Sequence, residues 1–229
     1  MKKNFWVIIF FVVLFIHLLA LAMDLPQVAT VTKPMLMPAV TGHFITSVSN
    51  SSPFRLFVIA ALFFSWAGDV LLMFQQQNSI FFLLGLSSFL IAHLFYIFFF
   101  HRIRKEQNIK SQLWTLLVVA SYYSVLIALL NPWLGEMRLP VRVYGLVISF
   151  MLLLALHMSY ISNRTAGRSM LTGAVLFVIS DSILAINKFW KPVPAGDVMI
   201  MLTYGLAQFF LIYGAVRYLS VDRFKKSNA

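Results

Sequence analysis

The sequence predicts an all-α fold class, a polytopic transmembrane bundle of eight helices, and three observations support this prediction. Of the 229 residues, 61% are hydrophobic and only 11% are charged, whereas soluble domains are about 45–50% apolar and about 25% charged. The mean hydropathy is +0.87. The 18 Lys and Arg, against 7 Asp and Glu, form short clusters between long apolar runs, as in loops at a membrane surface. We therefore expect no nucleic-acid partner, and the composition excludes a soluble enzyme or a disordered chain.

Eight apolar runs account for the predicted helices. A helix needs about 20 mostly apolar residues to cross about 30 Å of hydrocarbon. The runs, in order, are Phe5–Met23, Pro34–Val48, Arg55–Phe74, Ser79–His101, Gln112–Leu130, Val141–Ile161, Ser169–Phe189 and Asp197–Leu219. The second is short and interrupted by Pro38 and Gly42, but neighbouring helices can shield the carbonyl that a proline frees.

Short polar connectors separate these runs, and each one ends a helix. They are Asp24–Lys33, Ser49–Phe54, Gln75–Asn78, Arg102–Ser111, Asn131–Pro140, Ser162–Arg168 and Trp190–Gly196. None is long enough for a soluble domain, so we expect residues 1–229 to form a single integral-membrane domain. The chain has no cysteine, which excludes a structural disulfide and a thiolate metal site.

The distribution of basic residues predicts the orientation. With eight spans, 13 of the 18 Lys and Arg lie on the side of the N-terminus and the remaining five on the opposite side. Because cytoplasmic loops carry the excess of Lys and Arg, both termini are expected in the cytoplasm. An alternative is that Lys2, Lys3, the first apolar run and Ala20-Leu21-Ala22 form a cleaved signal peptide. The run of about 18 residues is longer than a usual signal core, which favours a retained helix.

Only two of the seven acidic residues lie well inside predicted spans, Asp69 and Asp181; the other five lie in loops or at helix ends, where we expect them to be solvated. An ionisable group inside a bilayer costs at least about 2.5–3.5 kcal/mol and calls for an explanation. Asp69 follows Arg55 by 14 positions, about 21 Å, and Asp181 follows Arg168 by 13, about 20 Å. The third and seventh helices run in the same direction, so both carboxyls are predicted at one depth, in the outer part of the membrane, as partners. The alternative is that each acid pairs separately with a lysine or a neighbouring helix.

Further polar side chains are predicted near the same layer. Tyr204, Tyr122 and Tyr123 lie at similar depth, and Ser180 and Ser182 flank Asp181. Two lysines, Lys33 and Lys188, are expected at the outer ends of the second and seventh helices, where lysines ordinarily extend to the interface. Together, above an acidic layer, they could also bind a phosphate. The five histidines include no i, i+4 pair, so a histidine zinc site is disfavoured and no metal or other cofactor is expected.

At these residues the sequence resembles the YhhN-type lysoplasmalogenases, a family of eight-span membrane proteins of bacteria and animals. The resemblance runs from about Lys33 to Gln208. The matching residues are Lys33-Pro34 with Pro38; Gly68-Asp69-Val70-Leu71-Leu72-Met73; Phe82, Gly85, Phe89, His93 and Tyr96; Gly173-Ala174, Phe177, Ser180-Asp181-Ser182, Ala185, Lys188 and Phe189; and Tyr204 with Ala207-Gln208. Single pieces are unspecific, but their order and placement together are specific.

The resemblance implies hydrolysis of the vinyl-ether bond of lysoplasmalogens, which are 1-alkenyl glycerophospholipids with a free second hydroxyl. The products are a fatty aldehyde and glycerophosphoethanolamine or glycerophosphocholine. The two intramembrane aspartates that the family is thought to use in catalysis correspond to Asp69 and Asp181. We expect seven further residues to bind the substrate: Lys33, Lys188, Tyr204, Ser180, Ser182, Tyr123 and Gln208. We expect a multi-pass protein of a bacterial inner (cytoplasmic) membrane, with a lysophospholipid of the bilayer as its partner.

This chemistry suits a pair of aspartates, because a vinyl ether is cleaved by acid. Protonation of the alkene carbon gives an oxocarbenium ion, which water captures. Two close carboxyls in low dielectric cannot both ionise easily, so the pair would share one proton. We assign Asp181 as the acid and Asp69 as the base or cation stabiliser. The alternatives are a proton-coupled transporter that uses the same aspartates, a lipid-binding scaffold, and a metal-dependent amidase of the ceramidase type.

Overall fold

The computed structural model describes residues 2–50, 52 and 54–227, and side chains within 4–220 of that part. Every regular element in this part is helical. The eight α-helices are α1 (Lys2–Ala22), α2 (Pro26–Ser47), α3 (Arg55–Met73), α4 (Ser79–Glu106), α5 (Leu113–Leu130), α6 (Arg138–His157), α7 (Arg164–Ala185) and α8 (Gly196–Ser227). Short 3₁₀ turns follow α5 and α6, and a π-helical turn, Ile186–Trp190, continues α7. The all-helical fold class is confirmed.

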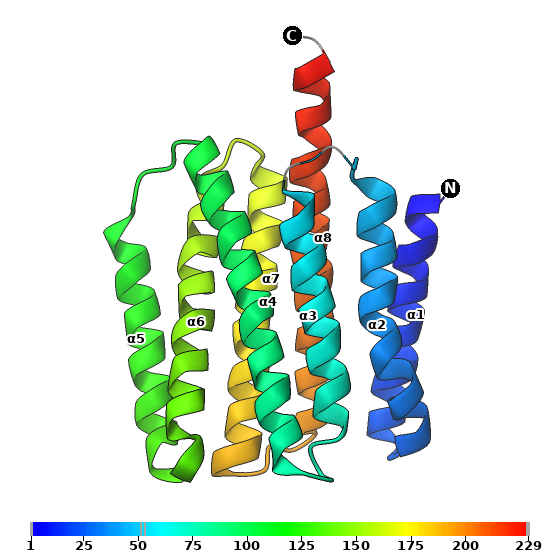
Figure 1. Cartoon of the computed structure of the whole chain (residues 1–229), viewed down its shortest axis with the longest axis vertical. Helices are drawn as coiled ribbons and strands as arrows, with labels where there is room; N and C mark the ends of the chain where they lie inside the picture. Colours follow the sequence, from blue (N-terminus) through cyan, green and yellow to red (C-terminus); the bar gives the residue numbers. More distant parts are fainter. Residues whose placement is uncertain (1, 51, 53, 228–229) are drawn as a thin grey trace.

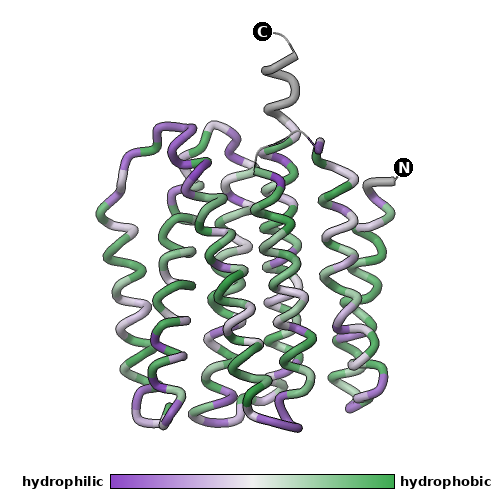
Figure 2. The backbone as a smooth tube through the Cα atoms, viewed as in Figure 1, coloured by the Kyte–Doolittle hydropathy of each residue, from purple (hydrophilic) through white to green (hydrophobic). Residues whose placement is uncertain are grey.

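Seven of the helices in the described part are long and apolar enough to cross a membrane, and α2 is the exception. It has 22 residues, about 33 Å, but its composition is less apolar and includes two internal prolines. The chain is therefore an integral, multi-pass membrane protein. Figure 2 shows the expected distribution, with hydrophobic residues along the middle of the helices and hydrophilic residues concentrated at the two ends of the bundle.

The helices form an up-and-down bundle in which α1 begins and α8 ends at the same end (Figure 1). The most extensive contacts join α7 to α8, α3 to α4, and α1 to α2. Helix α2 also contacts α3, and both α1 and α2 contact α8. Helix α5 contacts the rest of the bundle mainly through α6. Since consecutive helices alternate in direction, α1, α3 and α7 all finish at the end opposite the termini.

Small residues bring α7 and α8 into close contact. A β-carbon added to Gly173 would lie 2.6 Å from the backbone nitrogen of Leu211 and 2.7 Å from the carbonyl oxygen of Ala207. At Gly214, on the facing helix, it would lie 2.8 Å from the carbonyl oxygen of Ala166. Glycine in these places lets two membrane helices pack backbone to backbone. This contact fixes the position of the segment that carries Asp181 relative to the segment that carries Tyr204.

The start of α2 differs from the prediction, which placed Pro34 first and Lys33 in the preceding connector. The helix begins eight residues earlier, at Pro26, since a proline at the first helical position has no N–H bond to lose. Pro34 and Pro38 lie inside it. Pro38 cannot donate to the carbonyl of Pro34, and the indole Nε1 of Trp66 donates to that oxygen instead at 3.1 Å. Lys33 is consequently an interior residue of α2 rather than its outer end.

Candidate active site

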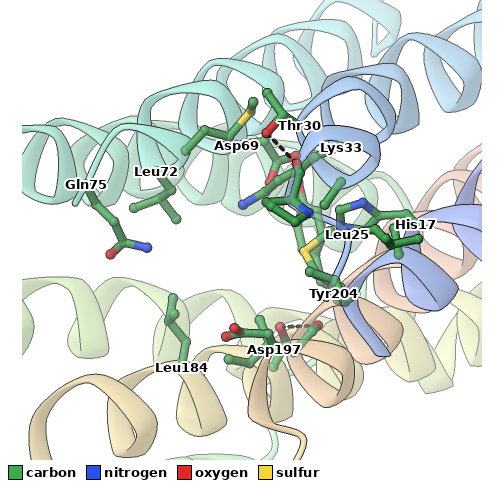
Figure 3. Close-up of a pocket in the computed structure, with 18 of the residues that line it drawn as sticks. His17, Leu25, Thr30, Lys33, Asp69, Leu72, Gln75, Leu184, Asp197 and Tyr204 are labelled. Atoms are coloured by element: carbon green, nitrogen blue, oxygen red, sulfur yellow. Dashed lines mark hydrogen bonds between the residues drawn. The ribbon is translucent and has the colours of Figure 1, made fainter. Parts of the chain in front are cut away.

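A cavity of about 340 Å³ lies between α1, α2, α3, α7 and α8, at the end of the bundle where α1, α3 and α7 finish. Its rim includes Asp24, in the turn between α1 and α2, Gln75, just after α3, and Asp197, at the start of α8. Figure 3 shows Gln75 and Leu72 on one side of the opening and Leu184 and Asp197 on the other. The cavity is a candidate active site because it is the place where polar groups converge within an otherwise apolar bundle.

Asp69 of α3 lines this cavity and is only 2% exposed. The hydroxyl of Tyr204 on α8 donates to its Oδ2 at 2.7 Å. The Tyr204 ring is fixed in turn by edge-to-face contacts with Phe89 and Phe177, whose centroids lie 5.8 and 5.5 Å away. The aspartate is thus held in one orientation by a hydrogen bond that bridges α3 and α8.

Asp181 of α7 lines the same cavity and is less deeply buried than Asp69. Its Oδ2 accepts a hydrogen bond from the hydroxyl of Tyr144 on α6. The Tyr144 ring packs edge-to-face on His93, with centroids 5.5 Å apart. Each aspartate is therefore oriented by one tyrosine from another helix, and both tyrosines donate to Oδ2.

The two aspartates occupy corresponding places in two parallel helices. Asp69 lies four residues before the end of α3 at Met73, and Asp181 lies four residues before α7 passes at Ala185 into the π-helical turn. The two carboxyls are within electrostatic range of each other. Both line the cavity near one end of the bundle, and their depth in a membrane stays a prediction. The cavity between them gives a small molecule access to both.

Of the two predicted lysines, only Lys33 lines the cavity, where Figure 3 shows it beside Asp69. It is within electrostatic range of Asp69 and of His17. Lys188 lies in the π-helical turn after α7 and reaches the rim indirectly, because its Nζ donates to Oε1 of Gln75 at 3.2 Å and lies 5.0 Å from the centroid of the Phe82 ring. One cation is thus inside the site and a second stands next to its opening.

The other predicted substrate-binding residues divide into two groups. Tyr204 and Ser180 line the cavity. Three others do not line it. Ser182 bonds the hydroxyl of Tyr122 at 2.9 Å, and Tyr123 donates to the carbonyl of Arg142 at 3.3 Å. Gln208 is buried on α8, one helical turn after Tyr204 along the chain. Gln208 accepts from the hydroxyl of Tyr96 at 2.8 Å and donates to that of Ser65 at 3.0 Å, so it joins α8 to α4 and α3.

The sequence reasoning missed several residues of the site. Asp24 and Asp197 are exposed, as expected, but they line the rim of the cavity and are not merely solvated loop residues. Tyr144, the partner of Asp181, lies six residues after the start of α6, a depth that counting along the sequence could have matched to the aspartates. His17 of α1 also lines the cavity. Depth can be read from the sequence, but which face of a helix points inward cannot.

The donor set of the cavity fits acid–base chemistry. Two carboxyls in one cavity, each oriented by a tyrosine, can pass a proton to a small molecule bound there and take one back. Lys33 supplies a positive charge for an anionic group of that substrate. Among the side chains of residues 4–50, 52 and 54–220, no group of three His, Cys, Asp or Glu is arranged to hold a metal ion.

Fold and site together define a class: a multi-pass helical membrane protein with a pair of intramembrane aspartates in a cavity near one end of the bundle. The model of the YhhN family matches residues 28–215, and the chain belongs to this family. It is 33% identical over 174 residues to lysoplasmalogenase TMEM86B of Rattus norvegicus, covering 76% of this chain and 67% of that protein. It is 35% identical over 173 residues to lysoplasmalogenase TMEM86A of Homo sapiens, covering 74% and 68%. No solved structure matches the chain significantly.

Proposed function

We propose that this protein hydrolyses the vinyl-ether bond of lysoplasmalogens, releasing a fatty aldehyde and glycerophosphoethanolamine or glycerophosphocholine. The observation that carries the proposal is the meeting of Asp69, Asp181 and Lys33 in one cavity. Membership of the YhhN family and the similarity to lysoplasmalogenases TMEM86B and TMEM86A support the same activity. The substrate is a lysophospholipid that enters from the bilayer.

In the proposed mechanism the aspartates share one proton, because two close carboxyls in a medium of low dielectric cannot both ionise easily. Asp181 donates this proton to the outer alkene carbon of the vinyl ether, which leaves an oxocarbenium ion. The negative charge of Asp69, oriented by Tyr204, stabilises the cation and then accepts a proton from the attacking water. The hemiacetal so formed breaks its bond to the glycerol oxygen, which takes up a proton, and the aldehyde leaves. One water is consumed, and the protons balance.

The position of the cavity supports a substrate that lies in one leaflet. In a lysoplasmalogen the labile bond lies just below the glycerol, and the aspartates line a cavity near one end of the bundle. We assign the lipid phosphate to Lys33, with Lys188 next to the opening as a second cation, and the alkenyl chain to the apolar surface between the helices. Tyr204 and Ser180 complete the polar wall around the glycerol.

We further propose that all eight helices span the bilayer, with both termini in the cytoplasm and the cavity open toward the outer leaflet of a bacterial inner (cytoplasmic) membrane. The length of α2, about 33 Å, and its pairing with α1 support the eighth span. The excess of Lys and Arg at the end where α1 begins and α8 ends supports the orientation. Residues 1–229 then form one integral-membrane domain.

The direct test is the release of aldehyde by the purified protein from a 1-alkenyl-2-hydroxy-glycerophosphoethanolamine in detergent. We expect turnover that an excess of a metal chelator does not reduce. The matching 1-alkyl lipid, which lacks the double bond, should give no product, since it cannot form an oxocarbenium ion by protonation. If the protein instead moves a lysolipid or protons across vesicles and releases no aldehyde, it is a transporter and the proposal is wrong.

A further inference from the structure

His17 of α1 is a polar residue of the cavity wall to which the proposed mechanism gives no role. Its side chain is 1% exposed and lines the same cavity as the two aspartates. Its Nδ1 bonds the hydroxyl oxygen of Thr32 on α2 at 2.8 Å. Its Nε2 is buried and has no hydrogen-bond partner among the described residues. A buried polar atom with no partner is costly, so an orphan at the wall of a binding cavity points to a ligand that completes it.

The bond to Thr32 favours one tautomer of the His17 ring. The Thr32 hydroxyl has one hydrogen, and the carbonyl oxygen of Val28 lies 2.8 Å from its oxygen. We assign that hydrogen to the carbonyl, so that Nδ1 of His17 donates to the Thr32 oxygen and carries a proton. In the neutral ring Nε2 then bears a lone pair and no hydrogen. A buried lone pair of this kind, on a residue of the cavity wall, is satisfied by a hydrogen from a hydroxyl, an amine or a water molecule.

The depth of His17 matches that of the catalytic pair. It lies five residues before the end of α1 at Ala22, whereas the aspartates lie four residues before the ends of α3 and α7, and the three helices are parallel. Lys33 follows Thr32 in sequence and is within electrostatic range of both His17 and Asp69. The two carboxyls, the imidazole and the ammonium group therefore line one cavity near one end of the bundle.

We propose that Nε2 of His17 accepts a hydrogen bond from the free hydroxyl on the second glycerol carbon of the substrate, and that this bond selects lysolipids. The proposal rests on the proposed function. In a lysoplasmalogen the vinyl ether, the hydroxyl and the phosphate stand on three consecutive glycerol carbons. With the ether at the aspartates and the phosphate at Lys33, the hydroxyl falls between them, in the layer that His17 shares. A lipid acylated or alkylated at this oxygen has no proton to donate and leaves Nε2 unpaired. His17 lies outside the matched residues 28–215, so the inference concerns this chain itself.

The test compares two substrates, the 1-alkenyl-2-hydroxy lipid and its 2-deoxy analogue, by their ratio of kcat/KM for aldehyde release. A buried acceptor left unpaired predicts that the wild-type protein prefers the hydroxyl substrate by about 10- to 100-fold. His17→Leu should bring this ratio close to one, by lowering the rate on the hydroxyl substrate while sparing the deoxy analogue. His17→Gln, whose side-chain carbonyl can reach the place of Nε2, should recover part of the preference.

His157→Leu is the matched control. His157 is a buried histidine near the other end of the bundle, where its Nε2 accepts from the backbone of Gln112 at 3.2 Å, so its removal should leave the ratio unchanged. Should His17→Leu fail to fold, Thr32→Val is the second variant. It removes the hydroxyl that holds the His17 ring, so the imidazole turns and the ratio of kcat/KM between the two substrates falls. A wild-type ratio near one, or equal losses on both substrates in the His17 variants, would overturn the inference and leave the hydrolase intact. No aldehyde from either substrate would overturn the proposed function with it.

Discussion

Removing the Tyr204 hydroxyl tests whether the orientation and charge of Asp69 matter for turnover. Tyr204→Phe deletes the donor of the 2.7 Å bond to Oδ2 of Asp69 and keeps the ring that packs on Phe89 and Phe177. The fold should therefore persist, and the change is confined to the contacts of one hydroxyl, which lies against Asp69 and the side chain of Gln208. In the proposed mechanism Asp69 carries negative charge opposite the oxocarbenium ion, so the lost bond is one made to a charged group.

The magnitude follows from the charge on the acceptor. A hydrogen bond to a charged group contributes about 1.5–3 kcal/mol, whereas a neutral one contributes about 0.5–1.5 kcal/mol. At about 1.4 kcal/mol for each factor of ten, Tyr204→Phe should lower kcat by about 10- to 150-fold. KM should change little, because the phosphate and the alkenyl chain bind elsewhere.

The assay is aldehyde release by the purified variant at saturating lysoplasmalogen, with folding checked by its thermal transition in detergent. Tyr96→Phe is the control, because Tyr96 is a buried tyrosine of α4 that donates to Gln208 and does not line the cavity. It should cost stability without lowering turnover per folded molecule. Wild-type turnover in folded Tyr204→Phe, or an equal loss in Tyr96→Phe, would refute the assignment of Asp69 as a charged group oriented by Tyr204.

Three other predictions concern substrate binding, packing and topology. Lys33→Gln should raise KM by about tenfold with a smaller effect on kcat, because it removes the cation assigned to the phosphate; steady-state kinetics would expose an error if kcat alone fell. Gly173→Val should destabilise the protein by about 3 kcal/mol or more in a denaturation titration, since its β-carbon would meet backbone atoms of α8 at 2.6 and 2.7 Å. Gly145→Val is the control and should cost less, because the nearest atom to its β-carbon is a side-chain atom at 3.3 Å. In this cysteine-free chain, a single cysteine at Gln77 should react in whole cells with a membrane-impermeant maleimide and one at Asn108 should not; the reverse labelling would invert the topology.

The fold class could be read from the sequence because hydropathy constrains membrane helices so strongly. Every predicted run corresponds to one helix, and the parallel placement of α3 and α7 followed from counting spans between Asp69 and Asp181. The start of α2 could not be read in this way. The connector around Pro26 is polar enough to suggest a loop, and only Trp66, distant in sequence, shows how the internal prolines are accommodated.

The site could be predicted only in part from the sequence. The sequence shows how far along a helix a residue lies, but not whether its side chain faces the cavity. Asp69, Asp181 and Lys33 share a layer and a cavity. Tyr123 has a suitable depth too, yet it faces α6 and bonds the carbonyl of Arg142. His17 has no charge or motif that marks it in an apolar helix, and its role in the wall depends on how the α1–α2 pair docks on the rest of the bundle.

The central claim, that the two intramembrane carboxyls act as one catalytic unit, is tested most directly by a double-mutant cycle on turnover. Asp69→Asn and Asp181→Asn should each lower kcat for aldehyde release by about 10³-fold or more, and the double variant should be no slower than the worse single one, because groups that act together lose their effect together. Glu136→Gln, which removes an exposed acid outside the cavity, should turn over like the wild type. Near-normal turnover in either folded single variant, or losses that multiply in the double variant, would contradict the claim.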